Sequence, residues 1–208
     1  MDGSSAEPVL VSLLPPGPNE SLFDFAPCLR AGEEAAYYRD EAAITRGGIL
    51  TLSEAVILQD SEAAEGGAEV VELLSSAPRV ALTIPCESSL PLLAVHLKDI
   101  GRFCAIEVEL RDENNDNFRI IITNRVTAVR VKDAQAVLPL VLHPGWNLVL
   151  IDLRDVLQRA FGLGYAMTTC VSVLASCRVA RIYLQARPLS DQELPPFLRF
   201  SWQQRADD

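Results

Sequence analysis

The segment from Phe103 to Arg111, where Glu107, Glu109 and Arg111 alternate with apolar residues, is the strongest single constraint on the fold of this chain. Successive side chains of a β-strand point to opposite faces, so this period of two predicts a half-buried strand. The polar segment Asp112 to Asn117 predicts a hairpin loop, because Asn and Asp tolerate left-handed backbone and hydrogen-bond their own main chain. The returning strand is expected at Phe118 to Asn124. In the strand that begins at Phe103, the residues expected to share the buried face are Cys104, Ile106, Val108 and Leu110.

Short apolar runs bounded by turn residues occupy most of the rest of the chain. A hairpin is expected across His143-Pro144-Gly145, between strands at Ala136 to Leu142 and Trp146 to Leu153. About nine or ten strands with one convincing helix predict an all-β fold, an antiparallel β-sandwich of jelly-roll type. The remaining strands are expected within residues 49–59, 69–74, 79–84, 90–100, 168–175 and 178–185.

The single helix is predicted directly after Asp152, which is placed to cap its N-terminus, with Asp155 near the positive end. Gly162 and Gly164 are expected to let the chain leave this helix through positive φ. Further along, Ser190 and Glu193 have the spacing of a capping box, which predicts a single helical turn before Pro195. The apolar stripe expected on the first helix comprises Val156, Leu157, Ala160 and Phe161.

The length of 208 residues fits one domain with an extended arm. We expect a flexible N-terminal arm at residues 1–20, a single sandwich domain at residues 21–203 and a C-terminal tail at residues 204–208. The arm is rich in proline, and Val9 to Leu14 could form an edge strand that orders against a partner. A disordered tail is the alternative reading of the same residues.

The net charge of −10 argues against unaided binding to nucleic acid or to anionic membrane. There is no run of about eighteen apolar residues and no basic region at the N-terminus, so neither a membrane span nor a signal peptide is expected. The five cysteines show no C-x-x-C spacing. An odd number in a chain without an export signal predicts reduced, mostly buried thiols in the cytosol.

Catalytic and metal-binding patterns are not found. His96 lies in an apolar run and His143 in a turn, so neither stands in a recognisable nucleophile motif. The acids of Asp112 to Asp116 resemble a calcium loop only loosely, and a solvated hairpin tip is the better reading. Arg178 and Arg181 lie three apart in a strand, so they are expected to face opposite sides as surface ion-pair residues. We therefore expect no enzyme activity, no cofactor, no metal and no small-molecule substrate.

An ordered series of short motifs between residues 80 and 200 resembles the cilia- and flagella-associated protein 20 family. No single motif is specific, but the series over this length is. The motifs of this series are Leu90-Pro91, Phe103, Glu107-Val108, Phe118-Arg119, Arg130 to Lys132, Gly145-Trp146-Asn147, Leu153, Asp155, Arg159 to Gly162, Tyr165, Cys177-Arg178, Arg181 to Tyr183, Arg187, Ser190 and Glu193 to Pro195.

The resemblance implies a fold similar to carbohydrate-binding modules and a non-enzymatic structural role in the axoneme of cilia and flagella. Members of this family lie at the inner junction of doublet microtubules, beside tubulin and other junction proteins. The partners implied are therefore tubulin or other axonemal proteins, and the location is the axonemal cytoskeleton. A basal-body or centriole-associated adaptor and a ligand-binding module of carbohydrate-binding type are the alternatives.

Most of the matched residues are expected to maintain the fold. Trp146 follows a turn, where its ring could cover the open end of the sandwich. A second reading makes the helix and the turn before Pro195 a contact ridge for a partner. The residues expected to define the fold are Gly145, Trp146, Asn147, Gly162, Tyr165, Cys177 and Arg178. The residues expected on the contact ridge are Arg154, Gln158, Arg159 and Arg187.

Overall fold

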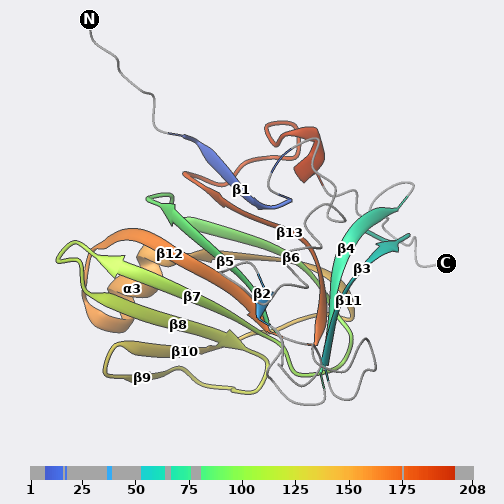
Figure 1. Ribbon diagram of the computed structural model, residues 1–208. Helices are drawn as coiled ribbons and strands as arrows, with labels where there is room; N and C mark the ends of the chain where they lie inside the picture. The colour runs from blue at the N-terminus through green and yellow to red at the C-terminus, as the bar shows by residue number, and fades with distance from the viewer. Residues whose placement is uncertain are drawn as a thin grey trace, which may run out of the picture.

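Two β-sheets packed face to face form the protein (Figure 1). The computed structural model describes residues 8–15, 17, 37–38, 53–63, 67–75, 81–174 and 176–199. The first sheet has the order β11 (Gly145–Asp152), β6 (Leu92–Asp99), β13 (Cys177–Gln185), β4 (Ala68–Ser75) and β3 (Ser53–Asp60), with β1 (Leu10–Leu14) also paired to β13. The second has the order β2 (Tyr37–Tyr38), β5 (Ala81–Ser88), β12 (Tyr165–Leu174), β7 (Ala105–Asp112), β8 (Asn117–Thr123), β10 (Gln135–Pro139) and β9 (Arg130–Lys132).

The two sheets are wound around each other in the manner of a jelly roll. Consecutive strands β5 and β6 lie in opposite sheets, and so do β12 and β13; β12 pairs with β5 while β13 pairs with β6. The predicted all-β sandwich is thus confirmed. One pair departs from the antiparallel pattern, because β10 runs parallel to β8.

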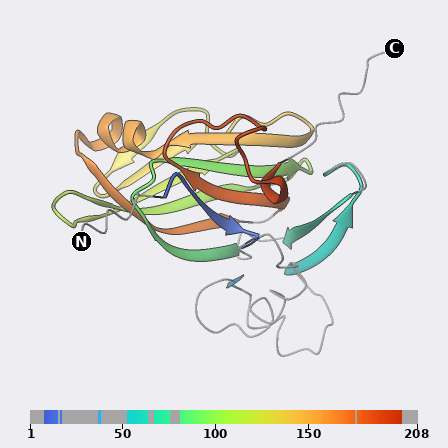
Figure 2. The same cartoon turned by 90° about the horizontal axis from the view of Figure 1, so that it is seen from above.

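The core lies between the sheets and is built by alternating inward-facing residues. All four apolar residues expected on one face of the strand after Phe103 are buried, and β6 is buried on both faces because it is a central strand. The sole α-helix of the described part, α3 (Leu153–Phe161), closes one end, while the β3–β4 hairpin lies at the other (Figure 2). The largest fully buried side chains are Leu14, Leu73, Leu82, Leu93, Leu97, Ile106, Leu110, Ile120, Leu153, Leu157, Ile182 and Leu184.

The loop between β7 and β8 is the tight hairpin that its sequence predicts. The buried carboxylate of Asp112 accepts hydrogen bonds from the backbone N–H groups of Asn114 and Asp116. Asn115 takes a φ of 67°, in the left-handed region that asparagine tolerates. These bonds close the loop and use the carboxylate that a calcium site would need. Within the described residues no group of His, Cys, Asp or Glu has the arrangement of a metal site.

The hairpin expected across His143-Pro144-Gly145 is wrong. Strand β10 belongs to the seven-stranded sheet, where it lies beside β8 and β9. Strand β11 belongs to the other sheet and pairs with β6 along its whole length. The segment between them is therefore a crossing from one sheet to the other. Turn residues mark where a strand ends, but they do not tell which sheet the next strand joins.

The first described segment of the chain belongs to the sandwich. Residues 10–14, within the expected N-terminal arm, pair antiparallel with β13 as the edge strand that their sequence suggests, and Leu13 and Leu14 are buried. The tail at residues 204–208 lies outside the described residues. The sequence also suggests a short strand or packed tail at Phe197 to Trp202, which the structure describes only as far as Arg199. Its first residues belong to a 3-10 helix, Pro196–Leu198, in which Leu198 is buried. No helix in the part of the chain described is long and apolar enough to cross a bilayer.

A bulge in β13 corrects the expected placement of its two arginines. The register against β6 shifts between Val179 and Arg181, so Arg178 lies opposite Lys98 and Arg181 lies opposite His96. Lys98 and His96 are two apart in one strand and share a face, so the two arginines share the outer face as well. The residue that the bulge inserts reverses the side predicted by simple alternation.

Four cysteines fall within the described residues, and all are free thiols. Cys104 and Cys177 are buried, and Cys86 and Cys170 are half-buried. Burial raises the pKa of Cys86 to about 12, with a smaller contribution from neighbouring Cys170, and raises the pKa of Cys104 to about 11. Such thiols stay protonated and act as small apolar side chains. Cys28 lies outside the described residues.

Candidate partner-binding surface

Helix α3 is positioned by the caps that its sequence predicts. The side chain of Asp152 accepts a 3.0 Å hydrogen bond from the N–H of Asp155. At the other end Gly162 has a φ of 74°, and its N–H donates to the carbonyl oxygen of Gln158. Gly164, by contrast, has no positive φ; a Cβ there would lie 2.5 Å from the carboxyl carbon of Glu113. Close approach of a neighbouring side chain, and not backbone conformation, is what favours glycine at position 164.

The two faces of α3 differ sharply. Leu153 and Leu157 are fully buried, and Phe161 packs against Phe118 with ring centroids 4.8 Å apart. The opposite face is open to solvent and carries the side chains of Arg154, Gln158 and Arg159. Arg159 forms a 2.8 Å ion pair with Asp155 one turn earlier. The helix therefore presents a polar surface on a rigid, doubly capped element.

Arg187 is held by the turn that follows β13. Its guanidinium lies 2.6 Å from a carboxylate oxygen of Glu193, whose other oxygen accepts hydrogen bonds from the N–H and the hydroxyl of Ser190. The N–H of Leu194 donates to the Ser190 carbonyl, which completes the single helical turn expected here. The Arg187 hydrogen bond, followed by those from Ser190, lowers the pKa of Glu193 to about 2.

The strand register places α3 and Arg187 at the same end of the six-stranded sheet. Asp152, at the start of α3, lies opposite Leu92, and Leu92 lies opposite Gln185, two residues before Arg187. The ion pairs of Arg159 and Arg187 are local, so both cations are fixed within their own elements. The structure thus brings the four residues of the expected contact ridge to one end of the sandwich. Their role in binding a partner stays a prediction.

Gly145 and Asn147 shape the turn that leads into β11. Gly145 has a φ of 88°. The side chain of Asn147 accepts from the N–H of His143 and donates to the carbonyl oxygens of His143 and Gly145. One amide therefore satisfies three backbone groups of the turn, and it fixes the point where the chain enters the six-stranded sheet.

Trp146 lies on the outer face of this sheet and does not cover the open end of the sandwich. Its ring packs on a small cluster formed by Ala63, Ala68, Val70 and Ala180, with Lys98 5.8 Å from the ring centroid. Alternation along β11 decides this, since Val149 and Ile151 point into the core and even-numbered residues point outward. Lys98 also forms an ion pair with Asp60, and Asp60 forms a second ion pair with Arg178.

Tyr165 and Cys177 are internal. The hydroxyl of Tyr165 lies 3.1 Å and 3.0 Å from the carbonyl oxygens of Ser88 and Leu90, and 2.9 Å from the Thr168 hydroxyl. It thereby ties β12 to the segment where the chain passes from β5 to β6. Cys177 is fully buried in the core at the start of β13.

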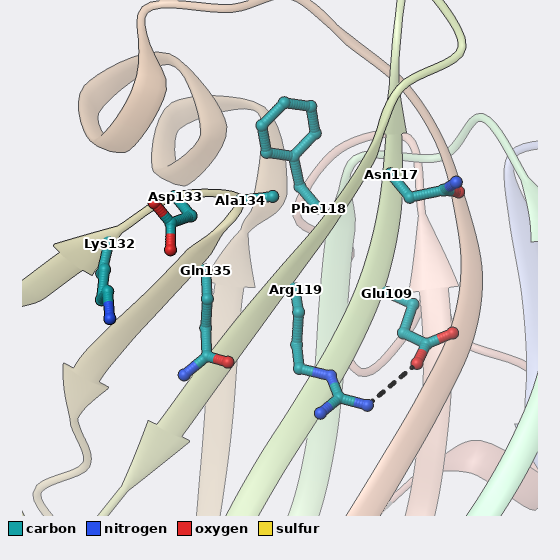
Figure 3. A pocket seen from close by; sticks show the side chains of 8 residues that line it. All are labelled: Glu109, Asn117, Phe118, Arg119, Lys132, Asp133, Ala134 and Gln135. Atoms are coloured by element: carbon teal, nitrogen blue, oxygen red, sulfur yellow. Dashed lines mark hydrogen bonds and ion pairs between the residues drawn. The ribbon is translucent and has the colours of Figure 1, made fainter.

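A shallow hollow of about 550 Å³ lies on the outer face of the seven-stranded sheet (Figure 3). Four side chains from successive strands form a polar row across it, because Arg119 lies opposite both Glu109 and Gln135, and Gln135 lies opposite Lys132. Arg119 pairs with Glu109 at 3.3 Å. Phe118 is the single aromatic residue of the lining, and its ring packs against Phe161. The hollow therefore has no aromatic platform on which a sugar ring could stack.

Two exposed leucines on β11 were not expected from the sequence. Leu148 and Leu150 each keep 46% of their surface accessible, whereas Ile151 of the same strand is buried. The run from Leu148 to Ile151 is apolar at every position, which indicates a strand buried on both faces. The structure places β11 at the edge of a sheet, and an edge position cannot be seen in the sequence.

The fold and this surface define the class of protein: a jelly-roll β-sandwich with a capped helix at one end and an apolar edge strand. Comparison with known proteins gives the family. The CFA20 domain model matches residues 69–202, so the chain belongs to the CFA20 domain family.

The relatives matched in sequence are named for cilia and flagella. The chain is similar to cilia- and flagella-associated protein 20 of Paramecium tetraurelia (36% identity over 107 residues, 51% of this chain and 56% of that protein). It is similar to the protein of the same name from Chlamydomonas reinhardtii (36% over 106 residues, 51% and 56%) and from Caenorhabditis elegans (30% over 106 residues, 51% and 52%). The chain spans about half the length of these relatives. A role related to cilia or flagella follows from this membership.

Proposed function

We propose that this protein is a non-enzymatic structural component of the ciliary or flagellar axoneme that binds doublet-microtubule tubulin or inner-junction proteins. Membership of a family named for cilia and flagella supports the location. The observation that carries the binding role is the contact ridge, which presents Arg154, Gln158 and Arg159 on one rigid, solvent-facing helix surface. A backbone already held in a rigid, capped helix has little conformational freedom left to lose when a partner binds.

The polar groups inside the molecule support a structural role. The side chains of Tyr165, Asp112 and Asn147 form their hydrogen bonds with backbone groups in loops of the same chain. His96 is buried, and its burial followed by the nearby charge of Arg181 lowers its pKa to about 4. A histidine enclosed and neutral in this way is poorly placed to act as a base for a substrate.

The ligand-binding alternative is less well supported by the hollow on the seven-stranded sheet. Recognition of a sugar on a flat sheet relies on exposed aromatic rings, and the lining offers only Phe118, which is occupied by Phe161. The basal-body or centriole alternative differs from the axonemal one in location alone. It is decided by the same localisation experiment.

The proposal is tested by charge reversal on the contact ridge. Arg154→Glu/Arg159→Glu is compared with Arg130→Glu/Lys132→Glu, a control of equal charge change on exposed residues of β9. Tagged chains are expressed in ciliated cells, and detergent-extracted axonemes are assayed for each. We expect the wild-type chain and the β9 control in the axonemal fraction, and at least a tenfold loss, about 1.4 kcal/mol, for the ridge variant. A wild-type chain absent from axonemes contradicts the proposal, and a signal confined to basal bodies favours the alternative.

A further inference from the structure

Strand β11 forms one margin of the six-stranded sheet. All eight of its residues pair with β6, from Gly145 opposite Asp99 to Asp152 opposite Leu92. Among the described residues no strand pairs with its other edge. Figure 2 shows β11, in pale orange, running along the margin of the molecule into α3. An edge strand of this length leaves a row of backbone donors and acceptors ready to pair with another strand.

The hydrogen-bond pattern shows which residues of β11 direct their backbone outward. The N–H of Leu153 donates to the carbonyl oxygen of Pro91, which continues the β11–β6 register by one residue. In an antiparallel pair, hydrogen-bonded positions alternate with positions that face away. The odd-numbered residues of β11 therefore bond to β6, and the even-numbered residues, Leu148 and Leu150 among them, turn their N–H and C=O groups to the free edge.

The same two residues expose their side chains. Leu148 and Leu150 are each 46% accessible on the outer face, whereas Ile151 on the inner face is buried. The strand contains no lysine and no proline, the residues with which proteins protect an edge from association. An open backbone edge and exposed apolar side chains thus occur at the same two residues, a combination that marks an interaction site.

We propose that β11 pairs antiparallel with β11 of a second copy of this chain, about a two-fold axis at Val149. In this register Leu148 lies opposite Leu150 of the second copy, twice over, and Trp146 lies opposite Asp152. Every one of these pairs joins residues whose backbone groups point outward, so each can exchange two hydrogen bonds. The pairing also keeps both leucines of both copies on one face. A self-complementary patch of this kind is what a two-fold dimer requires.

The charges near the strand favour this register. Asp152 of one copy comes to the end of the strand where Lys98 lies over the ring of Trp146. The net charge of −10 on each chain opposes association, but charges separated by more than about 8–10 Å are screened at physiological salt. Dimerisation is therefore expected to strengthen as salt rises, which is the reverse of the behaviour of an interface held by ion pairs.

Sedimentation velocity of the purified full chain tests the proposal. We expect a concentration-dependent shift from one chain to two, with a dissociation constant in the micromolar range. Leu148→Lys/Leu150→Lys should weaken association at least tenfold, because lysine on an edge strand opposes pairing. The matched control is Val129→Lys/Val131→Lys, which changes two exposed valines, 57% and 46% accessible, at the edge of the other sheet. This control should dimerise as the wild-type chain does.

A cysteine on the two-fold axis tests the register. Val149→Cys is expected to give a covalent dimer on mild oxidation with copper phenanthroline, since the two copies of residue 149 would lie directly opposite each other, within disulfide reach. Leu148→Cys, whose partner is Leu150, should crosslink far less, and the wild-type chain controls for the native cysteines. A wild-type chain that stays monomeric up to about 200 µM overturns the proposal, since a dimer with a micromolar dissociation constant would be largely formed at that concentration. That result leaves the axonemal proposal untouched. The dimer proposal is also overturned if Val129→Lys/Val131→Lys loses the dimer and Leu148→Lys/Leu150→Lys keeps it.

Discussion

The carboxylate of Asp60 accepts a 2.8 Å hydrogen bond from the guanidinium of Arg178, 118 residues further along the chain. The same carboxylate oxygen lies 3.1 Å from the ammonium group of Lys98. Asp60 ends strand β3, while Arg178 and Lys98 lie on β13 and β6, so one buried carboxylate links the β3–β4 hairpin to the centre of the sheet. Its side chain is only 2% accessible, against 29% for Arg178 and 16% for Lys98.

Replacement of this carboxylate should be costly. Asp60→Asn removes the carboxylate that two partly buried cations share, and we expect a loss of about 2–3 kcal/mol. This is below the 3–5 kcal/mol of a fully buried pair, because both cations keep some contact with water and each keeps a second carboxylate, Glu62 for Lys98 and Glu72 for Arg178. Urea unfolding followed by circular dichroism measures the change. Arg159→Ala, which breaks the exposed pair with Asp155, is the control and should cost about 0.5 kcal/mol or less. Equal losses in the two variants would contradict the burial argument.

The same carboxylate should contribute to acid sensitivity. Burial alone would raise its pKa, but hydrogen bonds from Arg178, the Glu62 N–H and Lys98 outweigh burial and hold the pKa of Asp60 below its ordinary value. A lowered pKa in the folded state means that stability is present above the unfolded-state value, about 4, and is lost as the pH falls through the folded value. The free energy of unfolding measured below about pH 4 should therefore fall less steeply in Asp60→Asn than in the wild-type chain.

His96 should add a second acid-sensitive range. Burial, followed by the charge of Arg181, lowers its pKa to about 4 from the ordinary 6.5. The unfolded chain takes up a proton at His96 below about pH 6.5 and the folded chain does so only near pH 4, so stability is lost between these values, by about 3 kcal/mol in all. His96→Leu should flatten the stability profile over this range. An unchanged slope in His96→Leu would show that other groups carry the effect.

Local signals in the sequence were sufficient for the elements whose hydrogen bonds are local. The loop closed by Asp112 and the helix capped by Asp152 and Gly162 follow from residues within four positions of one another. Features set by distant partners were not accessible in this way. The side on which Arg181 lies depends on a bulge against β6, and the exposure of Leu148 depends on β11 having no neighbour on one side among the described strands.

The contact ridge illustrates the same division. The outward direction of Arg154 and Gln158 is a property of one amphipathic helix and can be derived from its period. That Arg187 lies at the same end of the sheet requires the register of three strands, β11, β6 and β13. The sequence pattern predicts which face of a single element is exposed. How the elements come together depends on the pairing of strands that are distant in the sequence.

Tyr165 should stabilise the sandwich through its hydroxyl. Tyr165→Phe leaves the carbonyl oxygens of Ser88 and Leu90 without this donor in a buried site, and we expect a loss of about 1.5–3 kcal/mol. Thermal and urea unfolding measure it. Tyr183→Phe is the control: Tyr183 is equally enclosed, and within the described residues its hydroxyl has no hydrogen bond, so the loss should be about 0.5 kcal/mol or less. A larger loss for Tyr183→Phe would contradict the assignment.

The two glycines after α3 should respond differently to alanine, for the reasons that separate them in the structure. Gly162 has a φ of 74°, and a Cβ added there would meet nothing within 4 Å. The cost of Gly162→Ala is therefore conformational and should be about 1 kcal/mol. At Gly164 the backbone is ordinary, and the close neighbour is the carboxylate of the exposed Glu113, the end of a flexible side chain that can turn away. Gly164→Ala should therefore cost less than Gly162→Ala. Asparagine at position 162, which tolerates left-handed backbone, should recover part of the loss, whereas a steric origin at that position would make asparagine worse than alanine. Urea unfolding of the three variants distinguishes the two causes.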